Sequence, residues 1–363
     1  MDGIQITDKH KLEVVSKKEL FDNVDSVKIK ITKALFLPED FNSLEGDPQA
    51  VYPIIPARIG IGKIIETSGQ ISGTSQITAS RANMAIPPEN AGDDTFGIAR
   101  GVRVFPHPEV ACGQCYECAK GDDAHCSSFL IAGKTADGFL RDFAVFSNEN
   151  VSVLPPVVSD SDALFIDHVA LCDKIIDEID LQKGEHVVIV GGDVCGIILA
   201  QLVIYHQGIP ILVDNNDNNI ITAKNAGLYY TLFADNKIDR NVADLTGARL
   251  AKKVVYMTGS NLNTDIALKL AGSNATVCFA GFGTPGIKVN FSSALIKQLN
   301  FKCVNNGYGN IDSAINLLAN RAVDTSVFNI AQTKKEQASQ KIAEMAKSSD
   351  FSACGKMLII DMD

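Results

Sequence analysis

Short apolar strands alternate with helical segments through the second half of the chain, and this alternation constrains the fold more than any other feature. The strands are expected at 186–190, 210–213, 253–257, 275–279 and 301–304, and the helices at about 194–205, 218–226 and 264–270. Elements in this order form a parallel, doubly wound sheet whose ligand crevice lies beyond the carboxyl ends of the strands. We therefore predict an α/β fold here, followed within residues 311–363 by two helices and a closing strand at 356–360.

The first half of the chain is organised differently, and the change comes near Pro155 and Pro156. Its alternating stretches, such as Val27–Ile31 and Phe143–Phe146, are short and are interrupted by Gly, Pro and Asn, which is typical of an irregular β domain. The Thr, Ser, Gly and Asn-rich segment Thr67–Asn90 is expected to be a long surface loop. A chain of 363 residues with this contrast predicts two domains.

Charge and composition narrow the class of partner to a small molecule. The net charge is −10, the pI is about 5.1 and no run is rich in Lys or Arg, so neither a nucleic acid nor an anionic membrane is expected to bind. Residues 187–205 are apolar enough to resemble a membrane span, but Asp193 and three glycines interrupt them, and a strand followed by a helix explains them better. The N-terminus lacks a signal-peptide pattern and the nine cysteines are an odd number, so we expect a cytoplasmic, reducing location.

Four of the cysteines lie close together in the stretch VACGQCYECAKGDDAHC. Cys112, Cys115, Cys118 and Cys126 have the spacing C-x2-C-x2-C-x7-C. Four thiolates suit tetrahedral zinc and leave no position for water, so such a site is structural rather than catalytic. A pair of disulfides, an iron–sulfur cluster and free core thiols are the alternatives. We predict one structural zinc.

The stretch VVIVGGDVCG contains the first strand of the α/β half and the turn that follows it. The turn matches the G-x-G-x-x-G dinucleotide-binding motif with one change. Gly191 and Gly196 match, Gly192 lies between them, and Asp193 takes the place of the second glycine. A carboxylate near a phosphate costs roughly 3 kcal/mol at an effective dielectric near 20, although Asp193 can also cap the next helix. Asp214 ends the strand IPILVD, where an acid binds the ribose hydroxyls of NAD or serves only as a helix cap. We predict that NAD binds here, weakened by Asp193.

Three segments give nearly the whole chain a resemblance to a known family. The family is the zinc-containing alcohol and polyol dehydrogenases of the medium-chain dehydrogenase/reductase family. Its strand into the structural-zinc lobe resembles GVRVFPHPEVACGQC, and its segment after the lobe resembles DGFLRDF. Its returning strand resembles GKMLII. The resemblance implies a GroES-like catalytic β domain, 1–154 and 307–363, with its zinc lobe at about 107–130. It also implies a Rossmann domain at 155–306 that binds NAD, with the active site between the two domains.

A second zinc normally lies in the family's cleft, and this sequence departs from its ligand pattern. The family's first ligand is a cysteine in a G-x-C-G-[ST]-D stretch, where LFLPED has Leu37, followed by Glu39 at the hydroxyl position and a retained Asp40. In the P-G-H-E-x-x-G motif, PARIGIG has Arg58 at the histidine and Ile59 at the glutamate. Leucine cannot bind a metal, and arginine is a permanent cation without a lone pair to donate.

The third ligand region, ALFIDHVALC, keeps a carboxylate at Asp167, with His168 beside it. One ligand does not make a zinc site, so no catalytic zinc is expected. The resemblance places Arg58 and Asp167 in the same cleft, where one interpretation is a salt bridge that holds the two domains together. In the other interpretation, Arg58 polarises a carbonyl or binds an anionic substrate, while His168 or Glu39 handles a proton.

Two functions follow from these observations. The first is a zinc-independent, NAD-linked oxidoreductase that transfers hydride to or from a small alcohol, polyol or carbonyl compound. The second is a family member that has lost dehydrogenase chemistry and acts as a binding, regulatory or structural protein. In this family the last Rossmann strands of two subunits join edge to edge, and QLNFKCV, Gln298–Val304, resembles that edge, so a homodimer or homotetramer is expected.

Overall fold

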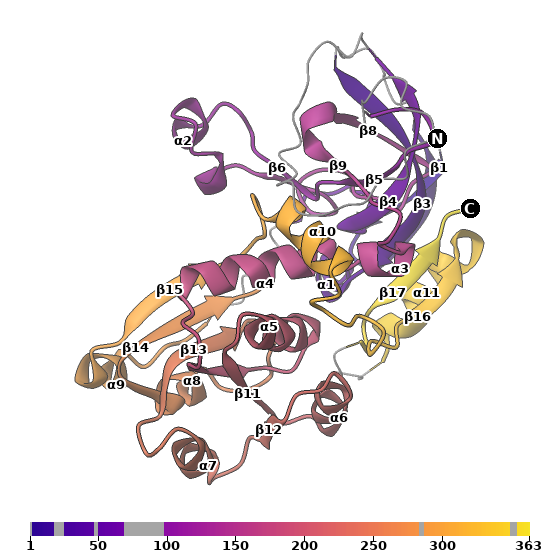
Figure 1. Ribbon diagram of the computed structural model, residues 1–363. Coiled ribbons are helices and arrows are strands. Elements are labelled where there is room, and N and C mark those ends of the chain that lie inside the picture. Colours follow the sequence, from indigo (N-terminus) through magenta and orange to yellow (C-terminus); the bar gives the residue numbers. More distant parts are fainter. Residues whose placement is uncertain (1, 18–24, 47–49, 69–97, 283–286, 349–353) are drawn as a thin grey trace.

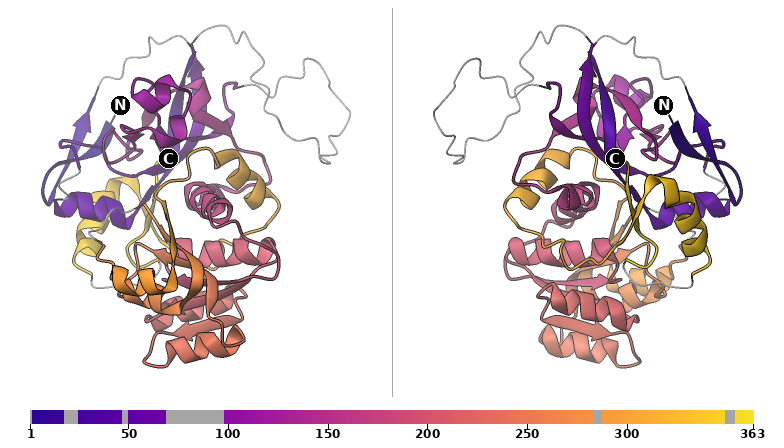
Figure 2. Two further views of the ribbon diagram at one scale, coloured as in Figure 1. Left: turned by 90° about the vertical axis from the view of Figure 1, so that its left-hand side faces the viewer. Right: turned by 90° about the vertical axis from the view of Figure 1, so that its right-hand side faces the viewer.

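The computed structural model of the chain describes residues 2–17, 25–46, 50–68, 98–282, 287–348 and 354–363, and the statements below concern these residues. Figure 1 shows two bodies, one built from β-strands near both ends of the chain and one with helices packed on a sheet from its middle. In both views of Figure 2, the strands of the first body lie above the sheet of the second. The chain therefore passes from the first body to the second and returns.

The middle of the chain forms a six-stranded sheet in the order β12-β11-β10-β13-β14-β15, with every neighbouring pair parallel. Its strands are β10 His186–Val190, β11 Ile209–Asp214, β12 Tyr230–Phe233, β13 Ala251–Met257, β14 Ala271–Ala280 and β15 Asn300–Val304. The helices along this part are α5 Val194–Tyr205, α6 Asp217–Asn225, α7 Ile238–Leu245, α8 Asp265–Leu270 and α9 Phe291–Lys297.

Side chains on successive residues of β10 enter two different cores. Val187 and Ile189 pack in one core with α5 and with α4, Ile166–Glu178, whereas Val188 and Val190 pack in the other with α7 and α8. Because strand side chains alternate between faces, a strand covered on both sides is apolar at every position. This explains the unbroken run HVVIV.

The other body is a seven-stranded sheet in the order β16-β17-β3-β4-β5-β9, with β8 paired to β3. Its strands are β3 Ser26–Phe36, β4 Ile59–Thr67, β5 Arg103–Pro106, β8 Phe143–Ser147, β9 Val151–Val153, β16 Ala331–Lys334 and β17 Leu358–Asp361. The last strand, β17, pairs antiparallel with β3, which returns the C-terminal segment to the first body.

Shorter elements surround the two sheets. The small strands are β1 Asp2–Asp8, β2 Lys11–Ser16, β6 Glu109–Val110 and β7 Leu130–Ile131. The remaining helices are α1 Pro38–Glu45, α2 Tyr116–Ala119, α3 Asp160–Ala163, α10 Ile311–Ala319 and α11 Lys335–Ala346, with 3-10 turns η1 Asp123–His125 and η2 Asn148–Asn150.

The predicted α/β class, with a parallel sheet after an irregular β body, is confirmed. All five predicted strands and three predicted helices of the α/β half are present, as are the two helices and the closing strand near the C-terminus. The sequence did not predict α3, α4, α7, α9, β12 or β16. Strands β12 and β16 have only four residues each and lie at sheet edges, where partial exposure removes the apolar run that marks a buried strand.

Three further expectations meet the structure only in part. Thr67 ends β4, and residues 69–90 of the expected surface loop lie outside the described residues. The apolar stretch 187–205 divides into β10 and α5, and none of the helices in the described part is long and apolar enough to cross a membrane. The domain boundaries at 154/155 and 306/307 stay a prediction.

Candidate functional site

A buried guanidinium lies between the two bodies, at the start of β4. Arg58 Nε donates to Asp167 Oδ2 at 2.7 Å, and Arg58 Nη2 donates to Glu109 Oε1 at 2.6 Å. The side chains of Arg58, Asp167 and Glu109 are only 8%, 1% and 7% exposed. The guanidinium also stacks over the Phe282 ring, 4.4 Å from its centroid. One positive charge, carried by the residue directly before β4, thus contacts residues of β6 and α4 and a ring that follows β14.

Charge–charge attraction keeps this cation ionised despite its burial. Burial disfavours the charged form, but the Asp167 and Glu109 carboxylates outweigh it and raise the pKa of Arg58. Burial also raises the pKa of Glu109, which Arg58 opposes and Asp167 reinforces. Arg58 therefore stays charged, and the pKa of Glu109 lies above its ordinary value.

His168 and Glu39, the other two predicted catalytic residues, lie near the cluster and form no hydrogen bond with it among the described residues. The His168 ring packs edge-on against Phe282, 5.4 Å between centroids, and its Nδ1 is buried with no hydrogen-bond partner among the described residues. Burial lowers the pKa of His168 to about 4, with a further contribution from Arg58, so its imidazole is neutral at pH 7. Glu39, in the first turn of α1, has a pKa raised mainly by burial.

The glycine turn after β10 has the backbone shape that its sequence predicts. Gly191 has φ +111°, and a Cβ there would lie 2.9 Å from Ser260 Cβ. A Cβ on Gly196 would lie 2.0 Å from the Gly191 carbonyl oxygen, so only glycine allows α5 to begin this close to β10. The first and third glycines of the motif therefore keep their structural roles.

Asp193 caps α5 with its own carboxylate. Its Oδ1 accepts a hydrogen bond from the Gly196 N–H at 2.7 Å, which is the helix-terminal donor that a phosphate would use. Burial raises the pKa of Asp193 to about 7, with repulsion from Glu39 and Asp214 adding to it. Near neutral pH, the side chain at the phosphate position is thus divided between the charged and the neutral form.

Asp214 ends β11 and is tied to the same turn. Its Oδ2 accepts from the Gly192 N–H and, at 3.2 Å, from Asn219 Nδ2, while its Oδ1 accepts from the Asn216 N–H at 2.7 Å. These contacts hold the turn against the start of α6. Asp214 is only 5% exposed. A contact between its carboxylate and a ribose stays a prediction.

The four predicted zinc ligands converge in a lobe that surrounds α2. The Sγ atoms of Cys112, Cys115, Cys118 and Cys126 all lie within 4.8 Å of one another. The Cys115 Sγ lies 3.4 Å from Cys118 Sγ and 3.9 Å from Cys126 Sγ. Zinc–sulfur bonds of about 2.3 Å in a tetrahedron require sulfur separations of about 3.8 Å, so the cluster fits one structural zinc.

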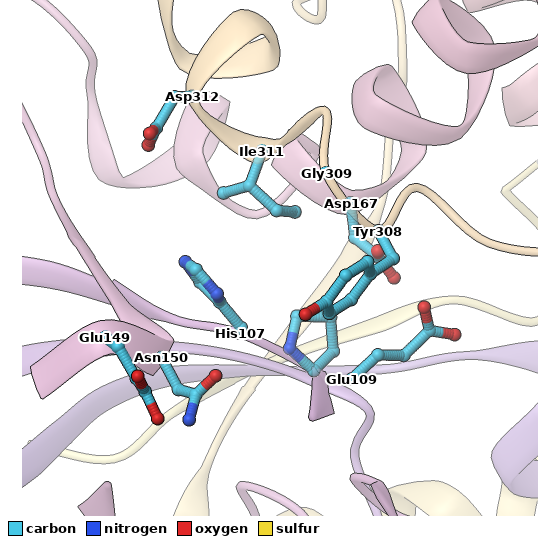
Figure 3. A pocket seen from close by; sticks show the side chains of 10 residues that line it. His107, Glu109, Glu149, Asn150, Asp167, Tyr308, Gly309, Ile311 and Asp312 are labelled. Atoms are coloured by element: carbon cyan, nitrogen blue, oxygen red, sulfur yellow. The ribbon is translucent and has the colours of Figure 1, made fainter. Parts of the chain in front are cut away.

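A polar pocket of about 200 Å³ opens beside the ion pair (Figure 3). Four carboxylates line it, those of Glu109, Glu149, Asp167 and Asp312, together with the His107 and Tyr308 side chains. In Figure 3, His107 lies in the middle of the pocket, with Asp312 above it and Glu109 to its right. The sequence analysis did not predict this pocket, although His107 and Glu109, the two ionisable residues in the otherwise apolar segment VFPHPEV, are a signal for it.

Comparisons with known proteins find dehydrogenases that are similar to the chain. No protein-family model matches the chain. A zinc-type alcohol dehydrogenase-like protein of Haemophilus influenzae is 23% identical over 251 residues, 69% of this chain and 73% of that protein, and a sorbitol dehydrogenase of Halalkalibacterium halodurans is 23% identical over 290 residues, 79% and 78%. The galactitol-1-phosphate dehydrogenase structure from Escherichia coli superimposes with a TM-score of 0.80 at 17% identity, covering 100% of both chains.

The chain is similar in sequence to zinc-type alcohol and polyol dehydrogenases, and it shares the fold of such a dehydrogenase. Its fold is accordingly a GroES-like β domain with a Rossmann domain. An E. coli alcohol dehydrogenase solved with NADH has a TM-score of 0.79 at 18% identity, covering 100% of this chain and 99% of its own.

The residues around Arg58 do not suit a second zinc. Leu37 is apolar and 1% exposed, and Arg58 is a permanent cation that is 7% exposed, so neither side chain can bind a metal ion. Asp40 holds these two segments together, accepting from Leu37 N at 2.8 Å and Ala57 N at 2.9 Å. Among the described residues, the four cysteines are the one group of three or more His, Cys, Asp or Glu side chains close enough to share an ion.

Proposed function

We propose that the protein is a zinc-independent, NAD-linked oxidoreductase that interconverts a small alcohol or polyol with its carbonyl compound. The observation behind this proposal is the buried Arg58, since the resemblance implies that its charge takes over the role of the metal that would polarise the substrate oxygen. A guanidinium has five N–H donors, and Asp167 and Glu109 accept from two of them. In this proposal the other three donors stabilise negative charge that develops on a carbonyl oxygen.

The residues that would hold NAD surround the glycine turn. Gly191 and Gly196 give the tight turn and the close start of α5, and Asp214 is the acid for the ribose. Asp193 opposes the pyrophosphate when it is charged and tolerates it when it is protonated. When bound, the nicotinamide supplies the hydride acceptor or donor.

The charge of the pocket favours neutral or cationic substrates. Its lining has four carboxylates, and Arg58, the one cation paired with them, is already neutralised by Asp167 and Glu109. A phosphorylated or carboxylated alcohol would therefore meet repulsion. We infer a neutral polyol or an amino alcohol.

Self-association and a cytoplasmic location are further parts of this proposal. Strand β15 is a sheet edge, and the neighbouring α9 exposes Phe291, Leu295 and Ile296 by 59%, 76% and 85%. An apolar surface beside an open strand edge is suited to a second copy of the chain.

The competing function, a family member without redox chemistry, has its own support. Asp193 already caps the helix that would receive phosphate, and two carboxylates already hold Arg58. NADH titration by fluorescence and thermal shift separates the two functions. Saturable binding with NAD-linked turnover of a polyol such as sorbitol supports the oxidoreductase, and no binding at millimolar NADH leaves the non-catalytic function.

A further inference from the structure

A chain of hydrogen bonds leads from the polar pocket to the protein surface. His107, between β5 and β6, forms a hydrogen bond of 2.9 Å between its Nε2 and Ser152 Oγ on β9. Ser152 Oγ in turn donates to Asp312 Oδ1 at 2.9 Å, in the first turn of α10. His107 lines the pocket, Ser152 is half-buried and Asp312 is exposed.

The direction of this chain follows from donor chemistry. An ionised carboxylate only accepts, so the single Ser152 hydroxyl proton points to Asp312. Ser152 Oγ must then accept from His107, which places the imidazole proton on Nε2. The neutral ring keeps its lone pair on Nδ1, and no described residue pairs with that atom. His107 can therefore receive a proton at Nδ1 and release one at Nε2.

The surroundings of His107 favour the neutral ring. Burial lowers the pKa of His107, and the Asp312 and Asp167 carboxylates oppose that effect. The other titratable groups that line the pocket are Asp312 from α10, Asp167 from α4, Glu109 from β6, Glu149 from η2 and Tyr308 from the segment before α10. A neutral imidazole is the form that accepts a proton during alcohol oxidation.

We propose that His107 is the general base and acid of this site, and that Ser152 and Asp312 pass its proton to water. This role rests on the proposed oxidoreductase function. During oxidation the substrate O–H bond breaks and its proton goes to His107 Nδ1. With NAD⁺ bound, the electron pair of the C–H bond would leave as hydride to the cofactor as the C=O bond forms. The Nε2 proton moves to Ser152 Oγ, whose own proton moves to Asp312 and then to solvent; reduction reverses each transfer.

Other candidates for this role are less suitable. Arg58 stays charged and cannot accept a proton. His168 does not line the pocket, and its ring is enclosed by Phe165 and Phe282. A purely structural interpretation, in which Ser152 only ties β9 to α10, predicts the same hydrogen bonds but no effect on proton transfer.

The test combines imidazole NMR with turnover. In ¹⁵N spectra of the folded full-length chain, the resonance lost in His107→Gln should report an Nε2–H tautomer, and Ser152→Ala should shift it. With sorbitol and NAD⁺, His107→Gln should lower kcat about 100-fold, within the usual range for general acid–base catalysis, and should remove the acidic limb of the pH profile. Ser152→Ala should lower kcat by roughly tenfold with KM unchanged. The exposed His206→Gln is the matched control.

The outcomes separate this proposal from the proposed function. An Nδ1–H tautomer, or a resonance that ignores Ser152→Ala, overturns the proton chain whether or not the enzyme turns over. Turnover with an unchanged pH profile in His107→Gln overturns the role of His107 alone. Absence of NAD-linked turnover in the wild type overturns both the catalytic role and the oxidoreductase function.

Discussion

The four-cysteine lobe and the cleft around Arg58 obtain their positive charge from different sources. In the lobe, four cysteine Sγ atoms lie within 4.8 Å of one another. The negative charge of their thiolates is compensated by an ion from solution. The cleft gathers two buried carboxylates around a cation that belongs to the chain. A zinc ion can be removed by a chelator, whereas a guanidinium cannot. The difference separates a site that needs a metal ion from one whose positive charge is part of the chain.

The largest effect is expected in the lobe. Cys118→Ser should reduce the zinc content from one per chain to none, because three thiolates bind zinc far more weakly than four. Metal analysis by mass spectrometry measures this directly. The exposed thiol Cys303 provides the control, since Cys303→Ser should keep its zinc. Zinc retained by Cys118→Ser would show that the cluster is not the binding site.

Removal of the internal cation should cause the largest loss of stability in the cleft. Arg58→Met leaves Asp167 and Glu109 buried without a partner, and breaking a buried pair in this way costs about 3–5 kcal/mol. Urea unfolding measures the change. Lys341→Met, which breaks an exposed pair with Glu344, should produce no measurable change.

A compensated variant sharpens this result. Arg58→Met combined with Asp167→Asn and Glu109→Gln should recover most of the lost stability, since no buried charge is left unpaired. If Arg58→Met alone costs less than about 1 kcal/mol, the ion pair is solvated in solution and the cleft does not hold a buried cation.

The lobe was predictable from sequence and the cleft only in part, for a physical reason. Cysteine spacing within 15 residues fixes a local ligand set, so Cys112 to Cys126 could be grouped without the fold. The Arg58–Asp167 pair spans 109 positions and was inferred only through a family resemblance. Glu109 was missed because its contact with Arg58 joins residues 51 positions apart in the sequence.

Asp193 in the glycine turn also shows what could and could not be predicted from the sequence. The sequence predicted that Asp193 caps α5, and its bond to the Gly196 N–H confirms this. The raised pKa could not be read from sequence, because it comes from burial and from the Glu39 and Asp214 charges. Those charges reach the turn from distant segments of the chain.

NADH affinity should depend on the charge of Asp193. Its pKa of about 7 means that the carboxyl is mostly neutral below pH 7 and charged above it, so wild-type affinity should fall as the pH rises from 6 to 8. Asp193→Gly should bind NADH more tightly at pH 8, by up to about a hundredfold. The gain should shrink at pH 6, and loss of the cap should lower stability by only a few tenths of a kcal/mol.

Fluorescence titration of both proteins at three pH values is sufficient. Equal affinities at pH 8 would mean that the Asp193 side chain points away from the bound cofactor.

Self-association gives the smallest expected change, a factor of two or four in mass. Light scattering at micromolar concentration should report a dimer or tetramer, and Ile296→Asp should lower the mass because it places a charge in the apolar surface beside β15. Tyr229→Asp, an equally exposed change near the opposite sheet edge at β12, is the control. A monomeric wild type would contradict the proposed contact.

The most direct test of a metal-free cleft is to measure zinc content and NAD-linked turnover in the same preparation. Protein with one zinc per chain should oxidise a neutral polyol such as sorbitol with NAD⁺, and added zinc should leave kcat/KM unchanged. Cleft chemistry would then rest on Arg58 and the pocket residues. A second zinc per chain whose loading rises and falls with activity would contradict the account.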